Sequence, residues 1–158
     1  FRVMLEKEAG NIDAVVVGYH NTFDYWGLLR LAGAVRAGAR LIATNDDATY
    51  PTPNGLIPGG GSILASIVEA SGVRPTIGGK PHEPMAQLVR QRLGVEDLSS
   101  AWMVGDRAST DGLFARQVGC KFAQVLTGVA SSASSSDVDH LVVPDLASFA
   151  RMLIDAQI

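Results

Sequence analysis

Two aspartates that follow a short apolar run are the first candidates for chemistry in this sequence. Asp106 comes directly after residues 101–104 and Gly105, and Asp111 lies five positions further along the chain. The apolar run predicts a buried β-strand, and open α/β sheets bind ligands beyond the carboxyl ends of such strands. A carboxylate there is a suitable oxygen ligand for Mg²⁺. We therefore consider Asp106 a candidate metal ligand, whereas Asp111 could equally be a helix cap.

A lysine in a glycine-flanked turn is the second candidate. Lys80 follows Gly78 and Gly79 and precedes Pro81, which we expect at the first position of a helix. A lysine held in such a turn can bind a phosphate oxygen through its charged ammonium group. Taken singly, Lys80 is also explained as a solvated surface lysine, and Asp106 as an ordinary turn aspartate.

The first half of the chain contains a β-α-β pattern that would position such residues. Residues 14–17 and 40–44 are short apolar runs and predict two buried strands. Between them, residues 24–37 have helical spacing and are followed by a glycine that can end a helix. This order indicates an α/β fold.

The rest of the chain continues with alternating helices and strands. Residues 45–61 hold three prolines and four glycines and predict a loop, and Ser62 would cap the helix that follows. Residues 130–136 are rich in serine and predict a second loop. The remaining predicted elements are helices at 62–71, 81–93, 111–118 and 146–154, and strands at 101–104, 122–126 and 141–143.

Composition restricts the class of protein. The 158 residues are 47% apolar and 18% charged, with 17 glycines, which fits a compact α/β protein. The formal charge is −3 and the basic residues are scattered, which argues against a nucleic-acid partner. No apolar stretch nears the roughly 20 residues needed to cross a bilayer. We therefore expect no nucleic-acid partner and no membrane partner.

Cysteine and histidine content adds two expectations. Cys120 is the only cysteine, so the chain cannot form an internal disulfide, and the first residues do not resemble a secretion signal. A cytoplasmic location is therefore the expectation. The three histidines, His20, His82 and His140, lack the spacing of a zinc site.

The two candidate segments together resemble a known family. Gly-Lys-Pro at 79–81, followed by Gly-Asp-Arg-x-x-Thr-Asp at 105–111, is similar to the third and fourth motifs of haloacid dehalogenase (HAD) superfamily phosphatases. The similarity is greatest to the branch of NagD-type, p-nitrophenylphosphatase and phosphoglycolate phosphatase enzymes. The resemblance runs from about residue 13 to residue 149 and includes residues 43–51, 58–61 and 126–129.

This resemblance implies a fold and a division into domains. Residues 1–76 would be the C-terminal part of an α/β cap domain of the C2 type. Residues 77–158 would be the C-terminal part of a Rossmann-like, three-layer α/β core. The boundary would then lie within residues 73–79.

The resemblance also implies a reaction. Enzymes of this family form an aspartyl-phosphate on an aspartate nucleophile, and a second aspartate acts as acid and base. Mg²⁺ and a lysine offset the charge on the phosphoryl oxygens. Lys80 would be the phosphate-binding lysine, Asp106 a metal ligand, and Asp111 a supporting carboxylate that orients Lys80 or water on the metal. The catalytic group would thus be Lys80, Asp106 and Asp111, with Asp106 and Asp111 at the metal.

A third set of residues would contact the substrate. Asn45, Asp47 and Thr49 match the cap loop that, in the family, faces the active site and helps to select a small phosphorylated metabolite. Lys80 would bind the phosphate of the same molecule. A turn rich in Asn and Asp explains the loop equally well.

The nucleophile motif of the family, Asp-x-Asp after the first core strand, has no counterpart in this sequence. Asp137 and Asp139 have the spacing, but they follow the serine-rich stretch and lie at the wrong end of the chain. The chain also begins with Phe1. We therefore expect the C-terminal portion of a phosphatase, inactive alone, with an open strand edge that its N-terminal half or another chain completes. A homodimer is a further arrangement.

Two alternatives come from other classes of protein. The first is a HAD-like binding or assembly module without catalytic activity. The second is a nucleotide-binding protein, which is disfavoured because no Gly-x-Gly-x-x-Gly follows a strand and no Ser or Thr follows Gly79-Lys80.

Overall fold

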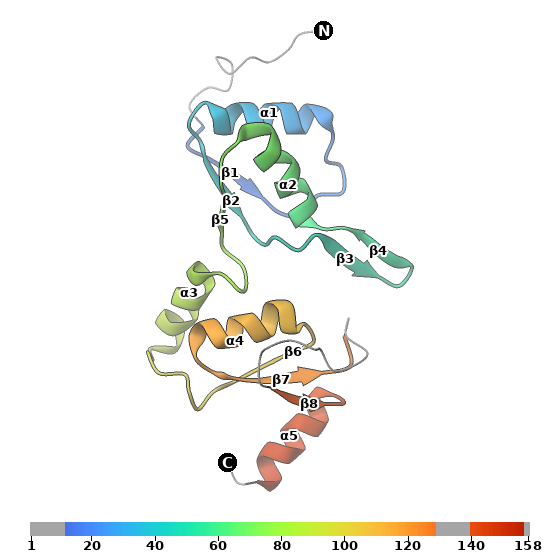
Figure 1. Ribbon diagram of the computed structural model, residues 1–158, viewed down its shortest axis with the longest axis vertical. Coiled ribbons are helices and arrows are strands. Elements are labelled where there is room, and N and C mark those ends of the chain that lie inside the picture. The colour runs from blue at the N-terminus through green and yellow to red at the C-terminus, as the bar shows by residue number, and fades with distance from the viewer. Residues whose placement is uncertain (1–11, 129–139, 157–158) are drawn as a thin grey trace. The chain divides into compact units, whose positions relative to one another are not determined.

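The protein consists of two compact units, shown in the computed structural model in Figure 1. The structure describes residues 12–128 and 140–156, and the two units divide between Gly79 and Lys80. The sequence-based boundary between residues 76 and 77 falls inside the short strand β5 (Thr76–Ile77), whose Ile77 pairs with Ala43 in the sheet of the first unit.

The first unit contains a parallel sheet with two helices on one face (Figure 1). The strands lie in the order β1-β2-β5, and Val15 of β1 is in register with Leu41 of β2. The strands predicted at 14–17 and 40–44 and the helix predicted at 24–37 are confirmed. The elements are β1 (Ala14–Val17), α1 (Tyr25–Arg36), β2 (Arg40–Ala43), α2 (Gly60–Ser71) and β5 (Thr76–Ile77).

Alternation along the strands explains why the helices cover only one face. Val15 and Val17 are buried against both helices, whereas Val16, between them, is 67% exposed. Asp24 begins α1 by accepting a hydrogen bond from the Gly27 amide at 2.7 Å. The core of this unit consists of Val15, Val17, Ala34, Val35, Ala39, Leu41, Ala43, Leu64 and Ile67.

The second unit has three layers, with helices on both faces of a parallel sheet ordered β6-β7-β8. Phe114 of α4 packs with Met103 on one face, and Phe149 of α5 packs with Ala123 on the other. The described part of this unit therefore has the predicted layered α/β architecture. Its elements are α3 (Glu83–Leu93), β6 (Trp102–Gly105), α4 (Leu113–Val118), β7 (Lys121–Val125), β8 (Leu141–Val143) and α5 (Leu146–Asp155).

The loop predicted at 45–61 is wrong in part, because it contains an antiparallel hairpin. Within residues 12–128 and 140–156, strands β3 (Thr49–Thr52) and β4 (Gly55–Pro58) pair only with each other. Each strand of such a pair has one free edge, where a proline need not donate a hydrogen bond. Proline therefore did not exclude a strand here.

The predicted capping role of Ser62 is also wrong. Helix α2 begins at Gly60, with Gly59 as its N-cap, and the Ser62 hydroxyl donates to the Ala48 carbonyl at 2.6 Å. The start of the helix packs closely on the loop before β3. A Cβ atom at Gly61 would lie 2.7 Å from the Asp47 carbonyl carbon and closer still to the Asp46 carbonyl oxygen.

Two predicted helix starts shift in the second unit. Helix α3 begins at Glu83 rather than at Pro81, with His82 as N-cap and Pro84 in the first turn. Lys80 lies in a turn before the helix, and the bond between Lys80 and Pro81 is cis. The helix predicted from residue 111 is preceded by a π-helical turn, η2 (Ala108–Gly112), and continues as α4.

Some predictions fall outside the described residues. These are the serine-rich loop at 130–136 and the rejected pair Asp137 and Asp139. Among the helices that the structure describes, none is long and apolar enough to cross a membrane.

We predict that Gly61→Ala lowers the free energy of unfolding by about 1–3 kcal/mol, because the added methyl group would overlap a backbone carbonyl that cannot rotate away. Urea unfolding of the 158-residue chain measures this change. Gly33→Ala is the matched control, since a Cβ atom at Gly33 meets nothing within 4 Å. The control should match the wild type or gain up to about 1 kcal/mol from helix propensity. Equal stability of Gly61→Ala and the wild type would contradict the close packing of α2.

Candidate phosphate and metal site

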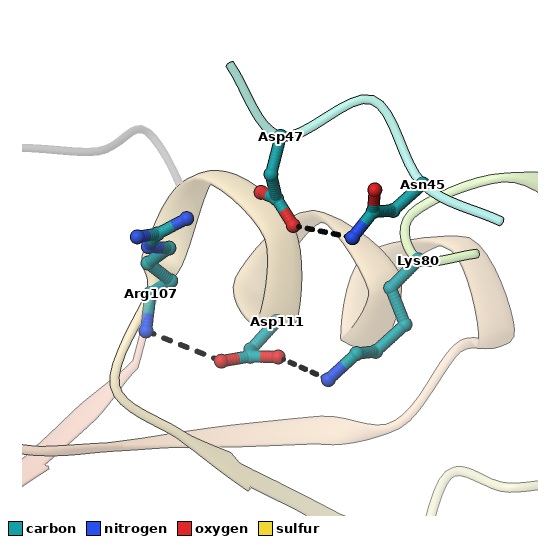
Figure 2. A network of polar contacts seen from close by, with 5 residues as sticks. All are labelled: Asn45, Asp47, Lys80, Arg107 and Asp111. Carbon is teal, nitrogen blue, oxygen red and sulfur yellow. Dashed lines mark hydrogen bonds and ion pairs between the residues drawn. The ribbon is translucent and has the colours of Figure 1, made fainter. Parts of the chain in front are cut away.

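The candidate site of the second unit centres on an ion pair between Lys80 and Asp111. The Lys80 Nζ atom lies 2.7 Å from Asp111 Oδ1, although 31 positions separate the residues. Figure 2 shows the two side chains pointing toward each other. The Asp111 side chain is 7% exposed and that of Lys80 is 42% exposed. A buried carboxylate thus orients a lysine whose side chain remains partly exposed to solvent.

The second oxygen of Asp111 is also engaged. The backbone amide of Arg107 donates to Asp111 Oδ2 at 3.2 Å (Figure 2), and the Asp111 amide donates to the Arg107 carbonyl at 2.7 Å. These contacts close the π-helical turn, a feature that is frequent at functional sites. Both carboxylate oxygens of Asp111 therefore face protein donors, which favours a supporting role for this residue.

Glycine at position 105 makes room for this arrangement. A Cβ atom on Gly105 would lie 2.6 Å from the Asp111 Cβ atom and closer still to its carboxylate. In the sequence, Gly105 is visible only as part of a motif, and nothing there indicates its contact with Asp111. The Arg107 amide could not be predicted either, because residue type carries no signal for a backbone donor.

Asp106 is the first residue after β6. It lies at the carboxyl edge of the parallel sheet and is half-buried. Within the described residues, no group of three or more His, Cys, Asp and Glu side chains could hold a metal ion. Zinc normally takes three or four such ligands, whereas Mg²⁺ is commonly held by one or two carboxylates and several waters. A single strand-end carboxylate such as that of Asp106 is a ligand type that Mg²⁺ accepts.

The first unit holds a separate polar group at the end of β2. The Asn45 Nδ2 atom donates to Asp47 Oδ2 at 3.3 Å (Figure 2), so the structure brings together two of the three predicted substrate residues. Thr49 instead opens strand β3, opposite Pro58 of the hairpin. Among the described residues, Asn45 Oδ1 is a buried oxygen with no hydrogen-bond partner. An unsatisfied buried acceptor is rare and favours a site that accepts a further donor.

Three other side chains that could do chemistry, those of His82, Cys120 and His140, lie in surroundings that favour a structural role. His140 contacts Gln124 Oε1 through its Nε2 atom at 3.0 Å, and His82 is the N-cap of α3. Burial raises the pKa of the Cys120 thiol, which lowers its reactivity as a nucleophile. The structure thus adds none of these three side chains to the pair of Lys80 and Asp111.

A family model described as HAD-hydrolase-like matches residues 77–149. This range includes Lys80, Asp106 and Asp111 and falls almost entirely in the second unit.

Curated proteins and solved structures of this superfamily match a larger part of the chain. D-glycerol 3-phosphate phosphatase of Mycobacterium tuberculosis is 41% identical over 120 residues, which are 76% of this chain and 33% of that protein. A hypothetical protein of Pyrococcus horikoshii is 39% identical with a TM-score of 0.82, over 94% of this chain and 57% of that structure. The structure of M. tuberculosis glycerol phosphate phosphatase in complex with magnesium is 35% identical with a TM-score of 0.74, over 88% of this chain and 43% of that structure.

The chain spans about a third to about half of the length of the curated relatives it matches. The similarity nevertheless extends across both units and includes the Gly-Lys-Pro and Gly-Asp-Arg-x-x-Thr-Asp segments within the residues of the family model. These findings agree with the α/β fold described above. The chain therefore belongs to the haloacid dehalogenase superfamily, and within it to the NagD-like phosphatase group.

Proposed function

We propose that this chain supplies the phosphate-binding and metal-binding part of a Mg²⁺-dependent phosphatase that hydrolyses small phosphomonoesters. The observation that carries the proposal is the 2.7 Å pair of Lys80 and Asp111, which the Arg107 amide joins to the backbone directly after the strand-end residue Asp106. An accessible ammonium group next to a carboxylate at the carboxyl edge of a parallel sheet suits a phosphate with a divalent cation.

Each side chain has a separate task in this proposal. Lys80 binds a phosphoryl oxygen and offsets its negative charge, and Asp111 holds the lysine in place for that purpose. Asp106 would hold Mg²⁺, and Asp111 supports that site through the turn it closes. When bound, Mg²⁺ would supply Lewis-acid stabilisation of charge on the phosphoryl group. The charge that develops in the transition state then meets groups that are already oriented.

The remaining parts of the reaction follow from the family. The nucleophilic aspartate and its acid-base partner would come from protein outside these 158 residues, because among the described residues no strand is followed by an Asp-x-Asp segment. Asn45, Asp47 and Thr49 would take part in selecting the substrate. The relative named for D-glycerol 3-phosphate makes a small phosphomonoester of that kind the first natural substrate to test.

The first test is Mg²⁺-dependent hydrolysis of p-nitrophenyl phosphate and glycerol 3-phosphate. The 158-residue chain is compared with the same chain extended upstream to its start codon. We expect activity only in the extended protein, and Lys80→Ala and Asp106→Asn should each lower kcat/KM by about 10²- to 10³-fold, as loss of an electrostatic contact to the transition state does.

Lys121→Ala is the matched control, because Lys121 is an exposed lysine that lies over the Trp102 ring in the same unit. It should leave activity within about twofold of the wild type, since surface substitutions are nearly neutral. Inactivity of the extended protein on all phosphomonoesters would favour the non-catalytic module. Activity of the short chain alone would show that its nucleophile lies within these residues.

A second prediction concerns Asp111→Asn. The amide group of the new side chain would face either the Lys80 ammonium or the Arg107 amide, and both are donors. We expect the free energy of unfolding to fall by about 1–3 kcal/mol and KM for the phosphomonoester to rise, because Lys80 is no longer held. Urea unfolding and steady-state kinetics measure the two effects.

Asp155→Asn, at the exposed end of α5, is the control and should change stability by no more than about 0.5 kcal/mol. If Asp111→Asn matched this control in both measurements, Asp111 would have no role in orienting Lys80.

A further inference from the structure

The carboxylate of Asp106 lies directly against the backbone of Gly128. A Cβ atom built on Gly128 would be 2.5 Å from the Asp106 Cβ atom and closer still to its Cγ and Oδ2 atoms. Nonbonded carbon atoms normally approach to about 3.5–4.0 Å. No side chain larger than hydrogen therefore fits at position 128 while Asp106 keeps its present orientation.

Backbone conformation does not explain glycine at this position. Gly119, which ends α4, has a φ of +79° in the left-handed region, and a Cβ atom there would meet nothing within 4 Å. Gly128 lies outside that region, so other residues could adopt its backbone conformation. The glycine is required by the contact with Asp106 and not by the turn.

Neither side of the contact can shift easily. Strand β7 is paired on both sides, with Gly105 opposite Gln124 and Val143 opposite Val125. Beyond the strand, the Leu126 amide donates to the Pro144 carbonyl at 3.2 Å. This bond holds the segment that leads to Gly128.

The backbone on the Asp106 side is held as well. The next amide, that of Arg107, donates to the buried Asp111 carboxylate at 3.2 Å. Because both backbones are held, a larger residue at position 128 would displace the Asp106 side chain, by rotation about χ1, before it moved either backbone.

We propose that Gly128 is a positioning residue that sets the orientation of the Asp106 carboxylate for Mg²⁺. The proposal rests on the function proposed above, because it assigns the metal to Asp106. Gly128 itself is exposed and contributes no side chain to the core. A substitution there should change the direction of the carboxylate with little effect on folding.

The second glycine contact of this site provides a contrast. Gly105 lies against Asp111 in the way that Gly128 lies against Asp106. Gly105→Ala should disturb the carboxylate that holds Lys80 and raise KM for the phosphomonoester. Gly128→Ala should instead raise the Mg²⁺ concentration needed for half-maximal activity.

The test follows the carboxyl ¹³C resonance of Asp106 by NMR, first without metal and then during titration with Mg²⁺. In the metal-free protein, the carboxyl ¹³C resonance of Asp106 should move in Gly128→Ala and stay in place in Gly33→Ala, which adds a methyl group where nothing lies within 4 Å. Titration with Mg²⁺ should then show binding weakened by about 10- to 100-fold, as expected when the support of a metal ligand is changed. Urea unfolding should place both variants within about 1 kcal/mol of the wild type.

A double variant separates positioning from a general structural effect. In an Asp106→Asn background, Gly128→Ala should weaken Mg²⁺ binding no further, because the group on which it acts is already changed. The proposal would be overturned if the Asp106 resonance did not move in Gly128→Ala. It would also be overturned if Gly128→Ala weakened Mg²⁺ binding by the same factor in the wild-type and Asp106→Asn backgrounds. If the resonance moves but the protein neither binds Mg²⁺ nor hydrolyses phosphomonoesters, the contact between Gly128 and Asp106 is supported and the proposed function is wrong.

Discussion

The parallel pairing of β6 with β7 is the constraint on which the candidate site depends. Parallel strands bring their carboxyl ends to one edge of a sheet, so the segments after Gly105 and after Val125 leave the sheet side by side. Asp106 begins the first segment and Gly128 belongs to the second. Strand β8 holds β7 from the other side, through the pairs that end at Val125 and Val143. The sheet thereby determines which residues meet at its edge.

Lys80 and Asp111 have different roles because they differ in charge and in burial. A carboxylate that is 7% exposed would be unfavourable without donors, and it has two, the Lys80 ammonium at 2.7 Å and the Arg107 amide at 3.2 Å. The lysine keeps 42% of its side chain exposed. It can therefore be oriented by the protein and still present positive charge to an anion. The π-helical turn at 108–112 places Asp111 where it meets both donors.

Six of the described glycines illustrate three different physical purposes. At Gly72, Gly94 and Gly119 it ends helices in the left-handed conformation. At Gly61 it lets the start of α2 approach the backbone of the loop before β3. At Gly105 and Gly128 it leaves space for carboxylates, and only this third purpose concerns the candidate chemistry. The three cannot be told apart from residue type, because they differ in what lies around each glycine.

The sequence by itself determined the local elements, since helical spacing and short apolar runs are properties of neighbouring residues. Strands at 14–17 and 101–104 and the family resemblance of residues 79–81 and 105–111 were visible at that level. The sequence predicted a loop where β3 and β4 form a hairpin, and this prediction was wrong because proline is tolerated at the free edge of each strand. Only the tertiary structure decided that Asp111 meets Lys80 across 31 positions and that Asp106 lies on Gly128. Such contacts join residues far apart in the chain, and their geometry depends on how the strands pair and the turns close.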